Sequence, residues 1–258
     1  MQTIGIIAAM TQESAAVLRM IKHWERAKLG PFQSRRFRVN EHDCQMLTSG
    51  MGIERAAEAA QMLVQASHPV LLVSVGVAGA VYADLAIGDV VAAGNTCLLE
   101  QDRLGPFQPL AHLSEAARQA VEQVLQSRGS HLFSGTAIST HGEQFIPEPG
   151  TASANPVLEM ETMGIARVAA QHGIPLLSLR AISDGPGAPI PFDLAAMMDE
   201  EFNLRTGKLL RMLLGNPRLL PSLVRMGENT RLAAGNAAAA LIAALIAKGE
   251  VVGKMDNG

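Results

Sequence analysis

The chain contains 258 residues, 48% of them hydrophobic, and carries a formal net charge of −3. This length and composition allow one α/β domain with a sizeable core. The acidic balance and the low aromatic content, 3%, argue against a nucleic-acid-binding protein. The two cysteines, Cys44 and Cys97, form neither a disulfide framework nor a metal-ligand spacing. We therefore expect a cytoplasmic protein that uses no metal or redox cofactor.

The first residues run directly into an apolar stretch, so no signal peptide is expected. The longest unbroken apolar run, Ala237–Ala247, is shorter than the roughly 20 residues that cross a bilayer.

Short apolar runs alternate with amphipathic helical patterns up to about residue 182. In chain order we expect a strand at Thr3–Ala9, a helix at Gln12–His23, a strand at Gln45–Ser49, a helix at Glu54–Gln65, strands at Val70–Val77 and Gly88–Ala93, a helix at Ser114–Gln126, a strand at His131–Thr140, a helix at Val157–His172 and a strand at Pro175–Ile182. This alternation predicts an α/β protein with a central mixed sheet that is covered by helices on both sides.

After Phe192 the strand signals stop and four helical segments follow. They are Asp193–Glu201, Gly207–Leu214, Arg218–Met226 and Thr230–Lys248, with breaks at Asn216-Pro217 and Gly227. We accordingly divide the chain into a catalytic domain at residues 1–203 and a helical C-terminal extension at residues 204–250.

The extension is basic and amphipathic. The segment from Arg205 to Arg231 contains six cationic residues and one acidic residue, Glu228, which gives it a net charge of +5. Such a segment packs on its own domain, on a partner subunit or on an anionic membrane surface, and the membrane contact would involve residues 205–235.

Three acidic positions stand at predicted strand or helix ends. Glu13 follows the first strand, Glu159-Met160-Glu161 lies near a helix start, and Ser183-Asp184 ends a buried strand. Ligands of α/β sheets bind outside the carboxyl ends of the strands. Carboxylates that meet there supply acid and base groups for cleaving a bond in a polar substrate.

Seven short motifs in order resemble the nucleoside phosphorylase/nucleosidase superfamily, and the methylthioadenosine/adenosylhomocysteine nucleosidases in particular. They are Ile4–Met10 with Glu13, Ser49–Gly52, Gly76–Ala80, Gly88–Val91, Phe145-Ile146, Glu159–Glu161 and Arg180–Asp184. A narrower set resembles the hopanoid-associated nucleosidase/phosphorylase group, which is thought to remove adenine from adenosylhopane: Ser49–Ala56, Ala166–Ala170 and Leu210–Leu223. The resemblance implies a three-layer fold, an adenine-releasing nucleosidase and a homodimer.

The resemblance also assigns roles to individual residues. Asp184 would protonate N7 of the purine, Glu161 would hold the ribose hydroxyls, and Glu13 would activate water. Met160 would pack beneath the ribose, Phe145 would stack on the base, and the Ile146 backbone would contact the base edge. Met10, Met51 and Phe192 would line the pocket for the 5′ substituent, and Val77, Gly79 and Ser183 complete the substrate-binding set. For Glu159 two roles remain open: it belongs to the substrate site, or it stabilises the N-terminal end of the helix.

Two other functions remain open at this point. A purine nucleoside phosphorylase needs an anion site, whereas Val77 offers no side-chain donor and Glu13 would repel phosphate. A backbone nest at Gly76–Ala80 could still bind an anion. Val77 also departs from the Ser of the methylthioadenosine enzymes. The second alternative is a non-catalytic nucleoside-binding module, which would not need the proton of Asp184.

Overall fold

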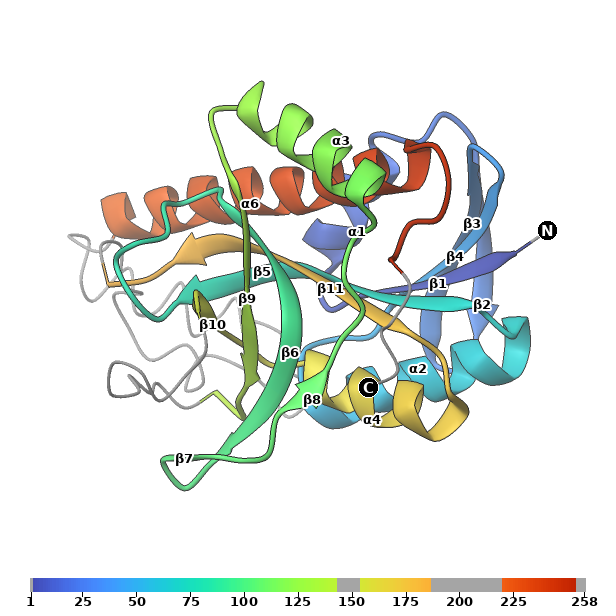
Figure 1. The fold of residues 1–258 in the computed structure, drawn as a ribbon, viewed down its shortest axis with the longest axis horizontal. Helices are drawn as coiled ribbons and strands as arrows, with labels where there is room; N and C mark the ends of the chain where they lie inside the picture. The colour runs from blue at the N-terminus through green and yellow to red at the C-terminus, as the bar shows by residue number, and fades with distance from the viewer. Residues whose placement is uncertain (1, 143–153, 187–219, 254–258) are drawn as a thin grey trace.

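A single mixed sheet forms the centre of the protein in the computed structural model, which describes residues 2–142, 154–186 and 220–253 (Figure 1). The sheet has eleven strands, nine of them in the spatial order β10-β9-β6-β11-β5-β1-β4-β3-β2, while β7 and β8 pair with β6. The strands are β1 (Thr3–Ala8), β2 (Trp24–Leu29), β3 (Phe32–Val39), β4 (His42–Thr48), β5 (Leu71–Ala80), β6 (Val90–Glu100), β7 (Arg103–Leu104), β8 (Gln108–Pro109), β9 (Leu132–Ser139), β10 (Pro156–Glu159) and β11 (Leu176–Asp184).

The central strands β4, β1, β5 and β11 are mutually parallel, so their carboxyl ends meet at one edge of the sheet. Strand β10 joins this edge by pairing antiparallel with the end of β5, where Leu158 faces Gly79. The edge is therefore assembled from the segments in which the sequence places its acidic residues.

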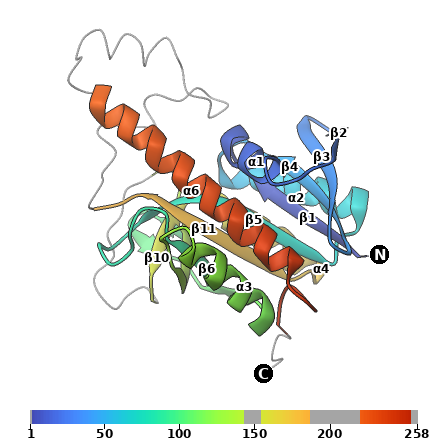
Figure 2. The ribbon, with the colours of Figure 1, turned by 90° about the horizontal axis from the view of Figure 1, so that it is seen from above.

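Helices cover both faces of the sheet (Figure 2). On one face α1 (Thr11–Leu18), α3 (Glu115–Gln126) and α6 (Leu220–Ile246) share a large core with the sheet, and on the other face α2 (Ile53–Ser67) and α4 (Thr162–His172) form a second core. The expected three-layer α/β fold is confirmed. Where α4 crosses α2, a Cβ on Gly164 would lie 2.1 Å from the carbonyl oxygen of Ile53, so this crossing requires glycine.

Helix α6 is one continuous helix across Gly227, and the expected break at that residue is wrong. Its C-terminal half belongs to the core because small alanine side chains, which also favour helix, let it lie close on the sheet: Ala233, Ala234, Ala237, Ala238, Ala240 and Ala244 are all buried. The buried Asn236 donates to the Gly88 carbonyl (2.7 Å) and fixes the helix in register.

By length and composition α6 resembles a membrane-spanning helix, but 61% of its most apolar window is buried inside the protein. The expected segments Asp193–Glu201 and Gly207–Leu214 lie outside the described residues, as does the proposed boundary at residues 203 and 204.

Other elements differ from the expected ones in their bounds or in their type. The hairpin β2–β3 was not predicted, because charged side chains obscure its two-residue alternation. The guanidinium groups of Arg26 and Arg35, which are paired across the hairpin, both lie near the ring of Trp24. Helix α1 is accordingly shorter than the predicted Gln12–His23. Strand β6 runs to Glu100 rather than stopping at Ala93. The first residues of the predicted helix Val157–His172 form β10 instead.

Candidate active site

Most of the described site residues that the sequence predicts lie at the carboxyl ends of the parallel strands. Met10 and Glu13 follow β1, Val77 lies in the last part of β5 with Gly79, and Asp184 ends β11. Met51 follows β4, and Met160 lies between β10 and α4. Most of them are partly exposed, whereas the strands behind them are buried. Phe145, Ile146 and Phe192 lie outside the described residues.

Glu13 is buried and held by two backbone donors. The N–H of Met10 donates to Oε2 (2.7 Å), and the N–H of Val77 donates to Oε1 (2.9 Å). Burial raises the pKa of Glu13 above its usual value, while the bond from Met10 and the charge of Arg180 act in the opposite direction. Glu13 thus joins α1 to β5 at the sheet edge and has the raised pKa of a candidate general base.

Arg180 is the cation at the centre of the site, and sequence reasoning did not give it a role. It is 1% exposed and makes ion pairs with Glu159 (2.8 Å) and Glu161 (3.3 Å). Its Nη2 also donates to Oγ of Ser74 (2.5 Å) and Oγ1 of Thr162 (3.0 Å). An arginine inside an otherwise apolar strand was the available signal, because a buried charge requires partners.

Gly76 brings Glu13 and Arg180 together. A Cβ at this position would lie 2.5 Å from Oε1 of Glu13 and 2.7 Å from Nη1 of Arg180. Both groups therefore press against the Gly76 backbone. The same Nη1 donates to Oε2 of Glu161 (3.3 Å). Glu161 is therefore bound to a guanidinium group whose charge also acts on Glu13.

Glu161 caps the start of α4 and is almost fully buried. The N–H of Gly52 donates to its Oε1 (3.3 Å). The pKa of Glu161 is raised to about 8, mainly by burial and also by the negative charges of Glu159 and Glu13, while the charge of Arg180 acts in the opposite direction. The carboxylate is placed between a backbone donor and a cation, which favours an acceptor role toward hydroxyl groups.

Glu159 serves the start of the helix, as the helix-end interpretation predicted. Its Oε2 accepts from the N–H groups of Glu161 (3.0 Å) and Thr162 (2.8 Å). These two donors belong to the unpaired N–H groups that every helix start must satisfy.

Asp184 lies on β11 beside Gly79 of β5. A Cβ on Gly79 would lie 2.8 Å from its Oδ2, and the hydroxyl of Ser183 donates to its Oδ1 (2.6 Å). Burial raises the pKa of Asp184, and the bond from Ser183 lowers it. Gly79 is three residues after Gly76, about 10 Å along a strand.

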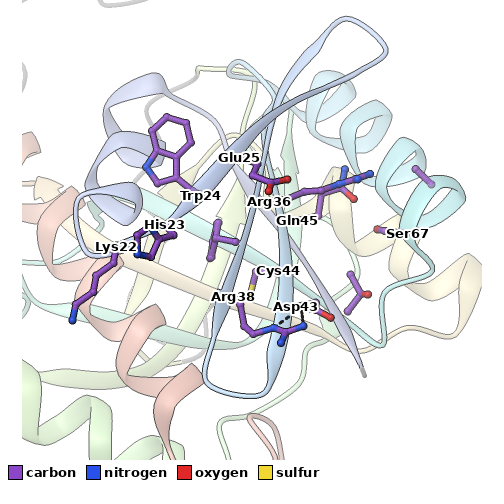
Figure 3. Close-up of a pocket in the computed structure, with 13 residues that line it drawn as sticks. Lys22, His23, Trp24, Glu25, Arg36, Arg38, Asp43, Cys44, Gln45 and Ser67 are labelled. Carbon is purple, nitrogen blue, oxygen red and sulfur yellow. Dashed lines mark hydrogen bonds and ion pairs between the residues drawn. The ribbon is translucent and has the colours of Figure 1, made fainter.

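A separate groove of about 790 Å³ lies near the amino ends of β1 and β4 (Figure 3). It is lined by Lys22, His23, Trp24, Arg36 and the ion pair of Arg38 with Asp43, among others. None of the three candidate catalytic carboxylates lines it. The groove is therefore distinct from the cluster around Arg180.

Comparisons with known proteins show the family to which the chain belongs. Residues 3–214 match the family model of the Phosphorylase superfamily, and the chain belongs to this superfamily. The 5′-methylthioadenosine/S-adenosylhomocysteine nucleosidase of Tolumonas auensis is 28% identical over 203 residues, 73% of this chain and 88% of the relative. The enzyme of the same name from Actinobacillus succinogenes is 28% identical over 214 residues, 77% of this chain and 90% of the relative. The expected resemblance is confirmed.

Solved structures share the fold. The nucleosidase of Colwellia psychrerythraea, in complex with adenine, has a TM-score of 0.70 and 19% identity, covering 98% of both chains. The nucleosidase of Neisseria meningitidis, in complex with methylthio-immucillin-A, has a TM-score of 0.66 and 18% identity, with 94% of this chain and 98% of that chain covered. Futalosine hydrolase of Helicobacter pylori has a TM-score of 0.65 and 21% identity, with coverages of 94% and 96%. At these identities the likeness concerns the fold, and the substrate has to be argued from the site.

Proposed function

We propose that this protein is an N-ribosyl hydrolase that cleaves the N-glycosidic bond of a 5′-substituted adenosine and releases adenine. The observation that carries the proposal is the placement of Glu13 and Glu161 around Arg180 at Gly76, with Asp184 beside Gly79 further along the same strand. The names of the most similar curated relatives support the same reaction and substrate class.

Each carboxylate has a step that fits its surroundings. Asp184, whose pKa is raised by burial, donates a proton to N7 as the purine leaves. Glu161 accepts hydrogen bonds from the ribose hydroxyls, and its ionised form, which prevails above about pH 8, favours the cationic sugar of the transition state. Glu13 removes a proton from the attacking water and is oriented for this by the N–H groups of Met10 and Val77.

Water is a better nucleophile for this site than phosphate. The described residues place one cation, Arg180, among Glu13, Glu159 and Glu161, and both of its Nη atoms already have carboxylate partners. An entering phosphate would therefore find no unpaired cation in the described part of this cluster, and an uncompensated charge is unfavourable in a buried site.

The experiment is a chromatographic assay for free adenine. Purified protein is incubated with methylthioadenosine, adenosylhomocysteine and adenosylhopane, each with and without phosphate. Adenine release that is independent of phosphate is the expected result. Release that requires phosphate would make the protein a phosphorylase, and binding without release from any of the three compounds would make it a nucleoside-binding module.

The panel also identifies the 5′ substituent. Met10 and Met51 are partly exposed near the site edge and offer apolar, flexible side chains to that group. A preference for adenosylhopane would support the narrower hopanoid-associated resemblance, and a preference for the two sulfur compounds would favour the nucleosidases named above.

We further propose a cytoplasmic homodimer with a peripheral membrane contact through the N-terminal half of α6. In this half Val224 is 53% exposed and Leu232 is 44% exposed, and Arg225 and Arg231 are exposed beside them. Apolar and cationic side chains together favour an anionic lipid surface. Since the other half of α6 is core, the test is V224E/L232E rather than deletion. Less of this variant than of the wild type should sediment with anionic liposomes, and an unchanged fraction would refute the membrane contact. The homodimer is tested separately, by measuring the molar mass of the protein in solution by light scattering.

A further inference from the structure

Glu159 is enclosed by hydrogen-bond donors. It is 6% exposed, and Oγ of Ser139 donates to its Oε1. Its Oε2 accepts from the N–H of Glu161 (3.0 Å), from both the N–H and Oγ1 of Thr162 (2.8 Å each) and from Arg180 Nη2 (2.8 Å). A carboxylate oxygen has about two lone pairs, so Oε2 has no capacity left for a ligand.

Two of these contacts lead directly to the groups that face the substrate. The N–H bond from Glu161 fixes the backbone of the residue that would hold the ribose hydroxyls. The ion pair to Nη2 fixes the guanidinium of Arg180, whose Nη1 contacts Glu161 and presses on Gly76 next to Glu13.

The guanidinium group depends on this anchor because it is rigid and planar. Three partners, Glu159, Ser74 and Thr162, hold Nη2, whereas Nε has no partner among the described residues. Once Nη2 is fixed, the direction of Nη1 toward Glu161 follows from the planarity.

We propose that Glu159 is a positioning residue, which sets the placement of Arg180 and Glu161 without contacting the substrate. The inference rests on the proposed function, since the placement of Glu161 serves to bind the ribose hydroxyls of the substrate. The contacts of Glu159 with Arg180 and Glu161 affect the reaction rate because a small misplacement of a reacting group can lower the rate by about 10²-fold.

The main test is Glu159→Gln, with methylthioadenosine as the assay substrate and adenine as the binding probe. Glutamine has the same shape, but its NH₂ group would face the donors around Glu159. We expect kcat/KM to fall by about 10²-fold. Adenine binding should be unchanged, because adenine lacks the ribose that Glu161 holds. A variant that is merely destabilised would lose both.

A second readout does not require turnover. The charge of Glu159 contributes to the raised pKa of Glu161, although burial contributes more. Arg180 lowers the same pKa and has the larger effect of the two charges, so release of its guanidinium in Glu159→Gln should move the titration of the Glu161 carboxyl carbon, followed by ¹³C NMR, to higher pH. The acidic limb of the rate profile should move in the same direction. A shift to lower pH would mean that only the charge of Glu159 is lost and that Arg180 stays in place without it.

Control variants separate positioning from folding. Glu122→Gln removes a partly exposed carboxylate of α3 that pairs with Arg118, away from the site, and should change none of the readouts. Glu159→Asp keeps the charge and should recover part of kcat/KM. Ser139→Ala removes the donor to Oε1 and also the acceptor of the Met163 N–H. It leaves the partners of Oε2 in place and should give a smaller loss in the same direction, which keeps the test available if Glu159→Gln does not fold.

The outcomes distinguish the two proposals. An inactive wild type would overturn the proposed hydrolase, while the Glu161 titration would still test the positioning. An active wild type with unchanged kcat/KM in Glu159→Gln would overturn the positioning. A parallel loss of adenine binding, or a Glu161 titration that does not move, would overturn it as well.

Discussion

The backbone N–H of Val77 donates a 2.9 Å hydrogen bond to Oε1 of Glu13, which ties the first turn of α1 to the end of β5. Because the donor is the backbone, the valine at this position still anchors the glutamate. The Val77 side chain packs against the main hydrophobic core. The departure from serine thus removes a side-chain hydroxyl and leaves the placement of Glu13 intact.

Glu13→Gln should abolish most of the turnover. An amide is a poor base, and its NH₂ group would leave one of the two N–H donors at Met10 and Val77 without an acceptor. We expect adenine release to slow by roughly 10²–10⁴-fold, the usual size for a lost acid–base group. The matched control is Glu54→Gln, an exposed glutamate in the first turn of α2. Wild-type rates in Glu13→Gln would remove Glu13 from the mechanism.

Gly76→Ala should impair activity without removing any functional group. The new methyl group would lie 2.5 Å from Glu13 and 2.7 Å from Arg180, so both side chains must move. We expect kcat/KM to fall by about 10²-fold and the melting temperature to fall with it. In the control Gly227→Ala, no atom lies within 4 Å of the added methyl group, and a mid-helix alanine stabilises by about 1 kcal/mol. Equal activity in the two variants would contradict the assigned contact.

Asp184→Asn tests the proton donor. Burial raises the pKa of Asp184, which favours a proton-carrying carboxyl group, and asparagine cannot transfer a proton. We expect turnover to fall by roughly 10²–10⁴-fold while the circular dichroism spectrum stays the same. Asp84→Asn, at an exposed position after β5, serves as the control. A variant that retains full turnover would show that the leaving purine needs no proton from this residue.

The sequence alone predicted the class of fold and the acidic residues, because apolar strands and strand-end carboxylates leave local patterns. It missed Arg180 as a functional residue, since the partners of that side chain come from β5, β10 and α4 and only the folded sheet brings them together. It also missed the hairpin β2–β3, whose charged residues hide the alternation, and it broke α6 at Gly227 because tertiary packing overrides the low helix propensity of one glycine.

The pH dependence of stability tests the burial of Glu161. Its pKa is about 8 in the folded protein, against a usual value of 4.5. Between these two values the folded state keeps a proton that the unfolded state has lost, so the contribution of Glu161 to stability is complete below pH 4.5 and is lost as the pH rises toward 8. Glutamine cannot titrate, so the free energy of unfolding of Glu161→Gln should rise relative to wild type across this window and stay level above it. Urea denaturation of both proteins at several pH values measures the difference. A difference that does not change with pH would mean that Glu161 titrates at an ordinary carboxyl pKa, and that Arg180 outweighs burial at this site.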